Sequence, residues 1–475
     1  MAIDHLTATE LIDHYKDRTL SPVEVTDKLF QHIHNQNPDL NAFVTLNEEA
    51  ARRKAKKAEE AYRTGKNIGA LEGVPVAIKD LTNTKGLRTT YGSPLYKNHM
   101  PNRDATVVKR LKAAGAIIMG KTNSPEFGYK ATTDNPLFGA TRNPWQLDTN
   151  AGGSSGGSAS AVAAGLVPLA EGSDGGGSIR IPAALCGVYG FKPTYGRVPY
   201  DNHLDGLFGT HEPFLHYGTL SRSAKDAALM YDVIKGYAAN DPFSLPDNGV
   251  SASATLDHAF NRPLKIGWTL DFGMYEVDKQ VATVFRQAID HLKSSGMNIE
   301  AVQVDFKMTL NAYIDFFERL WTAGLAADLQ NAAREHPEAF SKGLLDMIDR
   351  GSQLSAVEFK RLEKTRADVW HHMLGIFSNY DLLLSPTLAT PAFHWEWDGP
   401  PTINGKPIKA DADWVMTQVY NLTGTPAISI PIGLTADGLP VGLQAAAGRL
   451  QDEFLLRFAY FYEQNFPTLS SVNAR

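Results

Sequence analysis

The chain has 475 residues, of which 43% are hydrophobic and 21% are charged. This composition supplies enough apolar surface for a large folded core and excludes a disordered or fibrous protein. The 46 basic and 52 acidic residues give a formal net charge of -6. Because no sustained basic run is present, we expect no nucleic-acid partner.

The features that report on location favour a cytoplasmic protein. The first thirty residues are charged and lack the apolar segment of a signal peptide. The longest uncharged stretch, residues 149–170, is 22 residues long. Glycines and serines interrupt it, so we expect no membrane contact. Cys186 is the single cysteine, which excludes an internal disulfide and favours a buried thiol.

The N-terminal part of the chain alternates predicted helices and strands. Capping boxes at Thr7 to Glu10 and Ser21 to Glu24 start two amphipathic helices. In chain order, the pattern then predicts a strand at 43–46, a helix at 48–62, a strand at 74–78 ending at Lys79, a helix at 104–114 and a strand at 116–119. This alternation predicts an α/β fold with a mixed, largely parallel central sheet, covered by helices on both faces.

The composition of the sequence changes between Gly152 and Gly196, where 12 of the 40 glycines fall within 45 residues. Backbone in this segment must pass close to other groups. Beyond it the pattern predicts a strand at 264–270, a helix at 278–294, a strand at 299–304 and a long helical stretch at 309–379.

We find no repeat of fixed period and no Pro/Ser-rich linker, so we expect one domain over residues 1–475. Within it, residues 1–65 form a helical lead-in and about 70–235 the catalytic core. Residues 260–475 complete the sheet and shape the substrate pocket.

Two short motifs are set aside. His211, Glu212 and His216 miss the spacing of a zinc site by one residue, and Pro213 would break the helix that such a site requires. Residues 152–156 fit the G-x-S-x-G nucleophile elbow, but no strand is predicted before them. We therefore expect neither a catalytic metal nor an α/β-hydrolase site.

The residues suited to catalysis are Lys79 and two Gly/Ser-rich runs at 152–158 and 172–183. They resemble the amidase signature family, whose hallmark is a Gly/Ser-rich stretch with a nucleophilic serine, a second serine and a lysine. The separations of 75 residues from Lys79 to Ser154 and 24 from Ser154 to Ser178 agree with the family pattern. Further matching segments are 73–80, 120–123, 187–196, 381–386, 424–431 and 438–442.

The resemblance implies the amidase signature fold and a catalytic role for three side chains. Ser178 attacks the carbonyl, Ser154, which typically precedes a cis peptide bond in this family, relays its proton, and Lys79 is the final base. The chemistry is sound because a neutral lysine can replace histidine as a base when burial lowers its pKa. The apolar strand residues before Lys79 supply that burial.

The glycines before the nucleophile predict an oxyanion hole. We expect it to be formed by the amides of Gly175, Gly176, Gly177 and Ser178, because backbone without side chains can turn its N–H groups inward. In the family, the position of Gly175 more often carries a larger residue, and that of Ser173 more often threonine.

The remaining predicted site residues support the nucleophile loop. Ser155 is expected to assist from the first Gly/Ser run. Asp174 and Arg180 flank the nucleophile with opposite charge, and we expect them to pair beneath the loop.

The implied reaction is hydrolysis of an aryl or aliphatic carboxylic amide, or of a cyclic amide, ester or carbamate, through an acyl-serine and without a cofactor. The partner is thus a small-molecule amide substrate, and a homodimer is left open. Aromatic residues available to line a pocket are Trp145, Phe316, Phe317, Trp321, Phe393, Trp395 and Trp397.

Two alternatives stay open. One is the glutamine-hydrolysing subunit of a tRNA-dependent amidotransferase, which usually carries glutamine where this chain has Ile181. The other is an inactive scaffold that binds a ligand, although the presence of all three catalytic residues argues against it.

Overall fold

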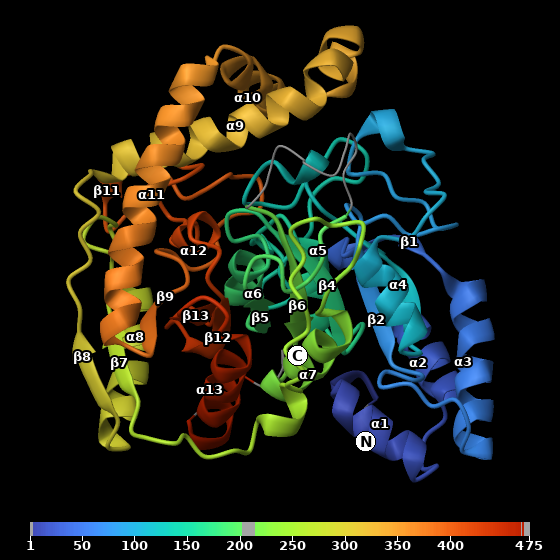
Figure 1. The fold of residues 1–475 in the computed structure, drawn as a ribbon. Helices are drawn as coiled ribbons and strands as arrows, with labels where there is room; N and C mark the ends of the chain where they lie inside the picture. Colours follow the sequence, from blue (N-terminus) through green and yellow to red (C-terminus); the bar gives the residue numbers. More distant parts are fainter. Residues whose placement is uncertain (1–2, 202–213, 467, 470–475) are drawn as a thin grey trace.

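The computed structural model describes residues 3–201, 214–466 and 468–469 (Figure 1). An eleven-stranded sheet runs through this described part of the chain. From one edge to the other its strands are β1 (Phe43–Leu46), β3 (Ile117–Thr122), β2 (Pro75–Lys79), β4 (Leu169–Asp174), β6 (His216–Ser221), β5 (Tyr189–Lys192), β12 (Ala427–Leu434), β13 (Pro440–Ala447), β9 (Leu382–Pro386), β7 (Lys265–Trp268) and β8 (Asn298–Ala301). Two short strands, β10 (Thr402–Ile403) and β11 (Lys406–Pro407), pair with each other. The large sheet takes strands from all three segments distinguished in the sequence.

The predicted mixed α/β sheet is confirmed, but the expectation that parallel pairing dominates it is wrong. Among the described residues, six of the ten neighbouring strand pairs are antiparallel and four are parallel. Parallel pairs join β3 to β2 to β4, and β9 to β7 to β8. The run from β4 through β6, β5, β12 and β13 to β9 is antiparallel. A tight turn joins β12 to β13, and such a connection permits only antiparallel pairing.

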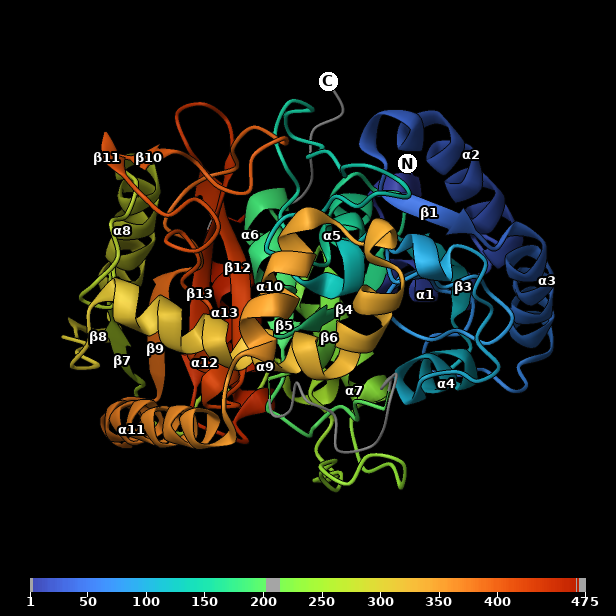
Figure 2. The ribbon, with the colours of Figure 1, turned by 90° about the horizontal axis from the view of Figure 1, so that it is seen from above.

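Helices cover both faces of the sheet. They are α1 (Ala8–Lys16), α2 (Pro22–Leu40), α3 (Glu48–Thr64), α4 (Thr106–Ala113), α5 (Gly156–Ala163), α6 (Arg180–Cys186), α7 (Ala224–Ile234), α8 (Lys279–Ser294), α9 (Leu310–Glu335), α10 (Lys342–Ser352), α11 (Ala356–Asn379), α12 (Val419–Leu422) and α13 (Asp452–Asn465). Figure 2 shows α5, α6 and α8 on one face and α4, α7, α11 and α13 on the other. None of the helices in the described residues combines the length and apolar character needed to cross a membrane.

The helical stretch predicted over residues 309–379 is divided into α9, α10 and α11. Helix α9 ends at Glu335, shortly before Pro337, whose ring cannot continue a helix. Ser355 starts α11 through a capping box with Glu358. Because of these breaks, α9 and α10 pack against each other at one end of the sheet, at the top of Figure 1.

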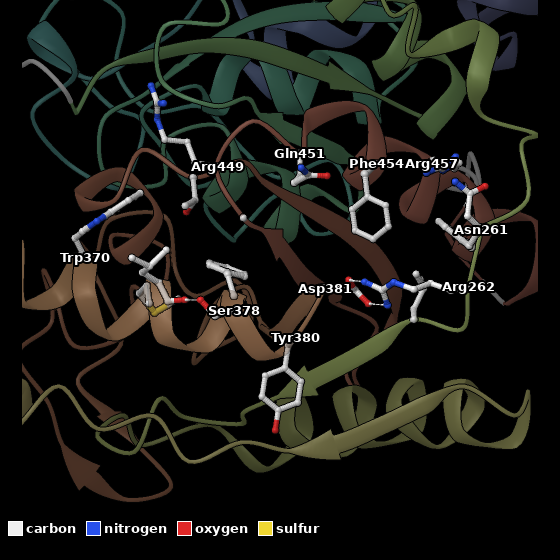
Figure 3. A pocket seen from close by; sticks show the side chains of 17 residues that line it. Asn261, Arg262, Trp370, Ser378, Tyr380, Asp381, Arg449, Gln451, Phe454 and Arg457 are labelled. Carbon is white, nitrogen blue, oxygen red and sulfur yellow. Dashed lines mark hydrogen bonds and ion pairs between the residues drawn. The ribbon is translucent and has the colours of Figure 1, made fainter.

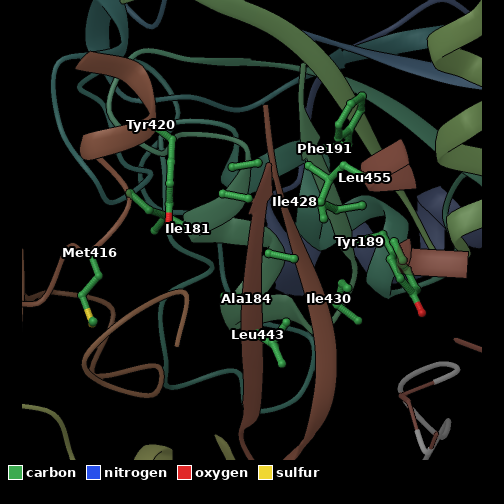
Figure 4. Close-up of a cluster of buried hydrophobic side chains, with 14 of the residues drawn as sticks. Ile181, Ala184, Tyr189, Phe191, Met416, Tyr420, Ile428, Ile430, Leu443 and Leu455 are labelled. Carbon is green, nitrogen blue, oxygen red and sulfur yellow. The ribbon is translucent and has the colours of Figure 1, made fainter. Parts of the chain in front are cut away.

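Helix α6 contributes side chains to the largest core cluster (Figure 4). Its Ile181 and Ala184 are buried in the same cluster as Ile428 and Ile430 of β12 and Leu443 of β13. Each large aliphatic side chain buried in this way contributes about 1.5–3 kcal/mol. The packing holds α6 firmly, and with it the loop that leads from β4 into the helix.

Candidate active site

Lys79 is the last residue of β2 and lies deep inside the protein. Every residue of β2 is buried, and Lys79 has no exposed surface. Its Nζ lies 2.6 Å from Ser154 Oγ, 3.0 Å from Ser173 Oγ and 3.4 Å from the Ser173 carbonyl oxygen. The amine therefore contacts two hydroxyls and a carbonyl group of the protein interior.

Burial lowers the pKa of the Lys79 amine from 10.5 to about 7, because removal from water penalises the charged form. The buried carboxylates of Glu171 and Asp174 act in the opposite direction and favour the protonated amine. Burial also raises the pKa of Glu171. Burial therefore favours the neutral amine of Lys79, the state in which a lysine can accept a proton.

Ser154 stands just before α5 and is 3% exposed. The peptide bond between Gly153 and Ser154 is cis. The cis bond therefore lies before Ser154, whereas the resemblance had implied a cis bond after it. A Cβ atom on Gly128 would lie 3.4 Å from Ser154 Oγ. The loop that contains Gly128 thus passes directly beside the Ser154 hydroxyl.

Ser178 lies in the loop between β4 and α6 and is half-buried. Its carbonyl oxygen accepts a hydrogen bond from the Ser155 N–H at 3.1 Å. This bond ties the loop of Ser178, the predicted nucleophile, to the segment that carries Ser154. Lys79 and Ser154 are enclosed, whereas Ser178 reaches a cavity.

Ser173 is a site residue to which the sequence assigned no role. It contacts Lys79 through both its hydroxyl and its carbonyl oxygen. The same carbonyl accepts a hydrogen bond from Ser155 Oγ at 3.1 Å. Ser173 reaches Lys79 because β4 pairs in parallel with β2. The only signal in the sequence was that the amidase signature family more often carries threonine at this position.

The amide of Gly177 does not face the cavity. Its N–H donates a hydrogen bond to Asp174 Oδ1 at 2.8 Å, so the structure gives no support to its predicted place in the oxyanion hole. Gly177 has a φ of 130°, and a Cβ there would lie 1.9 Å from Thr417 Oγ1. Glycine is therefore needed to make this turn. Gly176 and Ser178 line the cavity, and Gly175 is not among the described residues that line it. The roles of these three amides in an oxyanion hole stay predictions.

Asp174 and Arg180 form a fully buried ion pair beneath the nucleophile loop. Arg180 Nη2 lies 3.0 Å from Asp174 Oδ1, and Nε lies 3.0 Å from Oδ2. The guanidinium also donates to Asn421 Oδ1 at 2.7 Å, to Gln444 Oε1 at 2.7 Å and to the Thr417 carbonyl at 2.8 Å. Burial by itself would raise the pKa of Asp174, but Arg180 holds it well below its usual range.

The cavity at Ser178 has a volume of about 90 Å³. Its apolar walls include Tyr129, Ile181, Phe317 and Trp321. Phe317 and Trp321 are the two members of the predicted aromatic set that line it, and they are four residues apart on α9, on one face of the helix. The other five lie elsewhere: Trp145 donates to the Cys186 carbonyl, Phe316 and Phe393 are buried in the core, Trp395 lies under Arg142, and Trp397 is 47% exposed.

Comparison with known proteins identifies the family. The sequence model of the Amidase family matches residues 24–456. The chain belongs to this amidase family. The match covers β2, the loop before α6 and the strands that complete the sheet.

Individual relatives agree with this assignment. An acylamidase of Rhodococcus erythropolis is 37% identical over 461 residues, which cover 96% of this chain and 95% of that protein. A glutamyl-tRNA(Gln) amidotransferase subunit of Carboxydothermus hydrogenoformans is 35% identical over 497 residues, covering 98% of each chain. A solved bacterial aryl acylamidase of the amidase signature family superimposes with a TM-score of 0.91 at 34% identity, covering 96% of each chain. The resemblance drawn from the sequence is confirmed, and the protein is an amide-hydrolysing enzyme.

In this amidase, replacing Arg180 with methionine is expected to lower turnover and thermal stability together. The substitution leaves the buried Asp174 carboxylate without its counter-charge, a loss of about 3–5 kcal/mol. It also releases the loop from Asn421 and Gln444. The melting temperature and kcat should be measured on the same preparation.

Arg222→Met is the matched control for that experiment. Arg222 is also buried but donates to the carbonyls of Leu6, Val162 and Val167, away from the loop. The Arg222→Met variant should be less stable than the wild type but should keep its turnover at low temperature. If turnover of Arg180→Met fell with the melting temperature unmoved, the structural role of the ion pair would be wrong.

A second cavity of the amidase, about 680 Å³ in volume, lies between α11, α13 and the start of β9 (Figure 3). Trp370, Tyr380 and Phe454 line it, and Arg262 Nη1 lies 2.8 Å from Asp381 Oδ2 at its wall. None of the residues predicted as catalytic is among the described residues that line this cavity. The candidate chemistry is therefore concentrated at the smaller cavity.

The near-match to a zinc site falls partly outside the described residues, where His211 and Glu212 lie. His216 is buried in β6, with Nδ1 2.7 Å from the Phe214 carbonyl oxygen and Nε2 3.4 Å from Lys192 Nζ. Within the described ranges, no three His, Cys, Asp or Glu side chains are grouped as metal ligands would be.

Proposed function

We propose that this amidase hydrolyses small, uncharged carboxylic amides through an acyl-enzyme on Ser178. The observation that carries the proposal is the enclosed contact between Lys79 Nζ and Ser154 Oγ, 2.6 Å apart. A lysine that burial keeps neutral can remove a proton from a neighbouring hydroxyl. Ser178, which reaches the cavity, presents the attacking hydroxyl.

In the proposed first step, two protons move in sequence. The N–H groups of neutral Lys79 donate to the hydroxyl and carbonyl of Ser173, which leaves the nitrogen lone pair for the Ser154 O–H. Lys79 accepts the Ser154 proton while Ser154 takes the proton of Ser178. Ser178 Oγ then forms a bond to the substrate carbonyl carbon, and an electron pair moves onto the carbonyl oxygen.

The oxyanion is stabilised by the amides of Gly175, Gly176 and Ser178, which cost no reorganisation because the loop is already in place. When the oxyanion collapses, the C–N bond breaks and the proton held on Lys79 passes through Ser154 to the departing amine. Water then attacks the acyl carbon while its proton passes through Ser154 to Lys79. The bond between that carbon and Ser178 Oγ breaks, and the proton returns through Ser154 to Ser178 Oγ. The products are a carboxylic acid and an amine, and these steps use no cofactor.

The aromatic part of the cavity wall supports an aryl or aliphatic amide as the substrate. Tyr129, Phe317 and Trp321 line the cavity that Ser178 reaches, together with the charged residues Lys130, Glu318 and Asp411. The aromatic surface favours an uncharged aryl or aliphatic group against it. The similarity to an acylamidase and to an aryl acylamidase structure supports the same class. Cyclic amides, esters and carbamates present the same carbonyl and belong to the proposed range.

Glutamine hydrolysis for an amidotransferase is the second candidate. It is supported by the 35% identity to the amidotransferase relative. The side chain of Ile181 lines the cavity and offers no hydrogen bond to the charged ends of glutamine. Lys130, Glu318 and Asp411 also line this cavity, so the preference for the first candidate rests on Ile181 and on the aromatic residues of the wall.

A fluorophosphonate probe tests the nucleophile. We expect covalent label on the peptide that contains Ser178, found by mass spectrometry after digestion. The same preparation is assayed side by side with anilides, aliphatic amides, carbamates and glutamine. Labelling of another serine would refute the nucleophile, absence of label and of turnover would favour a binding scaffold, and preference for glutamine would favour the amidotransferase activity.

A further inference from the structure

Two aromatic rings of α9 lie directly on the glycines of the nucleophile loop. A Cβ on Gly175 would lie 2.7 Å from Trp321 Cζ3, and a Cβ on Gly176 would lie 2.9 Å from Phe317 Cζ. Such distances are shorter than packed carbon atoms tolerate. The rings reach the loop only because both residues lack side chains.

The Trp321 ring is held in place from its other side. Its Nε1 donates a hydrogen bond to the Tyr129 carbonyl at 3.2 Å, and it is nearly parallel to Phe317, with ring centroids 6.4 Å apart and an interplanar angle of 11°. Both rings line the cavity that Ser178 reaches. The ring pair therefore forms an aromatic wall of the cavity that Ser178 reaches.

We infer that Gly175 and Trp321 together set the specificity of the enzyme for amides that carry an aromatic ring next to the scissile bond. This inference rests on the proposed function and names its substrate class. The absent side chain at Gly175 admits the Trp321 indole, and the indole with Phe317 stacks against a flat substituent. Gly175 does not have a left-handed φ, so it is required for space and not for backbone conformation.

The test compares acetanilide with propionamide in the wild type, Gly175→Ala, Trp321→Leu and the double variant. Alanine keeps the Gly175 N–H but pushes the indole away, and leucine removes the stacking surface. Each single variant should lower the ratio of kcat/KM for acetanilide to kcat/KM for propionamide about tenfold or more, because both amides share the oxyanion contact at Gly175 and only acetanilide carries a ring that stacks on the indole. The double variant should be close to Trp321→Leu, because the ring that the new Cβ strikes is gone and the remaining contact, 3.0 Å to Leu215 Cδ2, is with the end of a flexible side chain.

Trp321→Phe, alone and combined with Gly175→Ala, gives the same comparison with a smaller loss of core packing. It should retain most of the acetanilide affinity and tolerate Gly175→Ala better than the wild type does. Equal changes for both substrates, or independent effects of the two substitutions, would overturn the inference while leaving the proposed function intact. A wild type that hydrolyses neither amide would overturn both.

Discussion

Ser178→Ala is expected to lower kcat by about 10⁵-fold or more, because it removes the only atom proposed to bond to the substrate carbonyl. The substitution deletes one half-buried hydroxyl and leaves the Ser178 carbonyl free to accept the Ser155 N–H. Folding and substrate binding should therefore persist. The measurements are single-turnover kinetics, the melting temperature and labelling by the fluorophosphonate probe.

The matched control is Ser160→Ala, in the same Gly/Ser-rich part of the chain. Ser160 is buried, and its hydroxyl donates to the Arg142 carbonyl at 3.0 Å, away from Lys79. It should show a small loss of stability, about 1 kcal/mol, and nearly unchanged kcat. A Ser178→Ala enzyme that still forms an acyl-enzyme at a comparable rate would show that another residue is the nucleophile.

Lys79→Met is expected to lower kcat by about 10³- to 10⁴-fold, the contribution of a well-placed general base. Methionine fills a similar volume but cannot accept the Ser154 proton. In the wild type, kcat/KM should rise about tenfold per pH unit below pH 7 and level off above it. We expect kcat/KM to fall at lower pH because Lys79, with a pKa of about 7, is then protonated and cannot accept the Ser154 proton.

Lys121→Met is the control that separates the two buried lysines. Lys121 is also fully buried, and burial lowers its pKa to about 8, but its Nζ contacts Thr84 Oγ1 and Thr89 Oγ1, both 3.2 Å away. The pH midpoint near 7 should persist in this variant. If the pH midpoint of kcat/KM shifted in Lys121→Met but stayed the same in Lys79→Met, Lys121 and not Lys79 would be the base.

Local patterns predicted much of the secondary structure. The alternation at residues 43–46 matches the observed bounds of β1, and the helix predicted at 278–294 is α8 with Asp278 as its N-cap. Both depend on a few neighbouring residues, so a short window of sequence is sufficient. The stretch at 309–379 was less well predicted, because its apolar periodicity continues past breaks that Pro337 and Ser355 introduce.

Partners far apart in the chain were not predictable in the same way. Asp174 and Arg180 are six residues apart, and their pairing could be inferred from charge and spacing. Asn421 and Gln444, which complete the bonding of Arg180, are more than two hundred residues away. Asn421 lies in α12 and Gln444 in β13, and nothing local to either residue indicates that it comes to lie beside α6.

By itself, the sequence determined the family, the α/β class and the residues expected to carry the chemistry, because these depend on short motifs and on the periodicity of apolar side chains. Only the tertiary structure decided that antiparallel pairs outnumber parallel ones, that Ser173 contacts Lys79, that the Gly177 amide turns toward Asp174, and which aromatic rings reach Ser178. Each of these depends on which strands lie side by side and where a ring or an amide can be buried. That is settled by the packing of the whole chain and not by its local pattern.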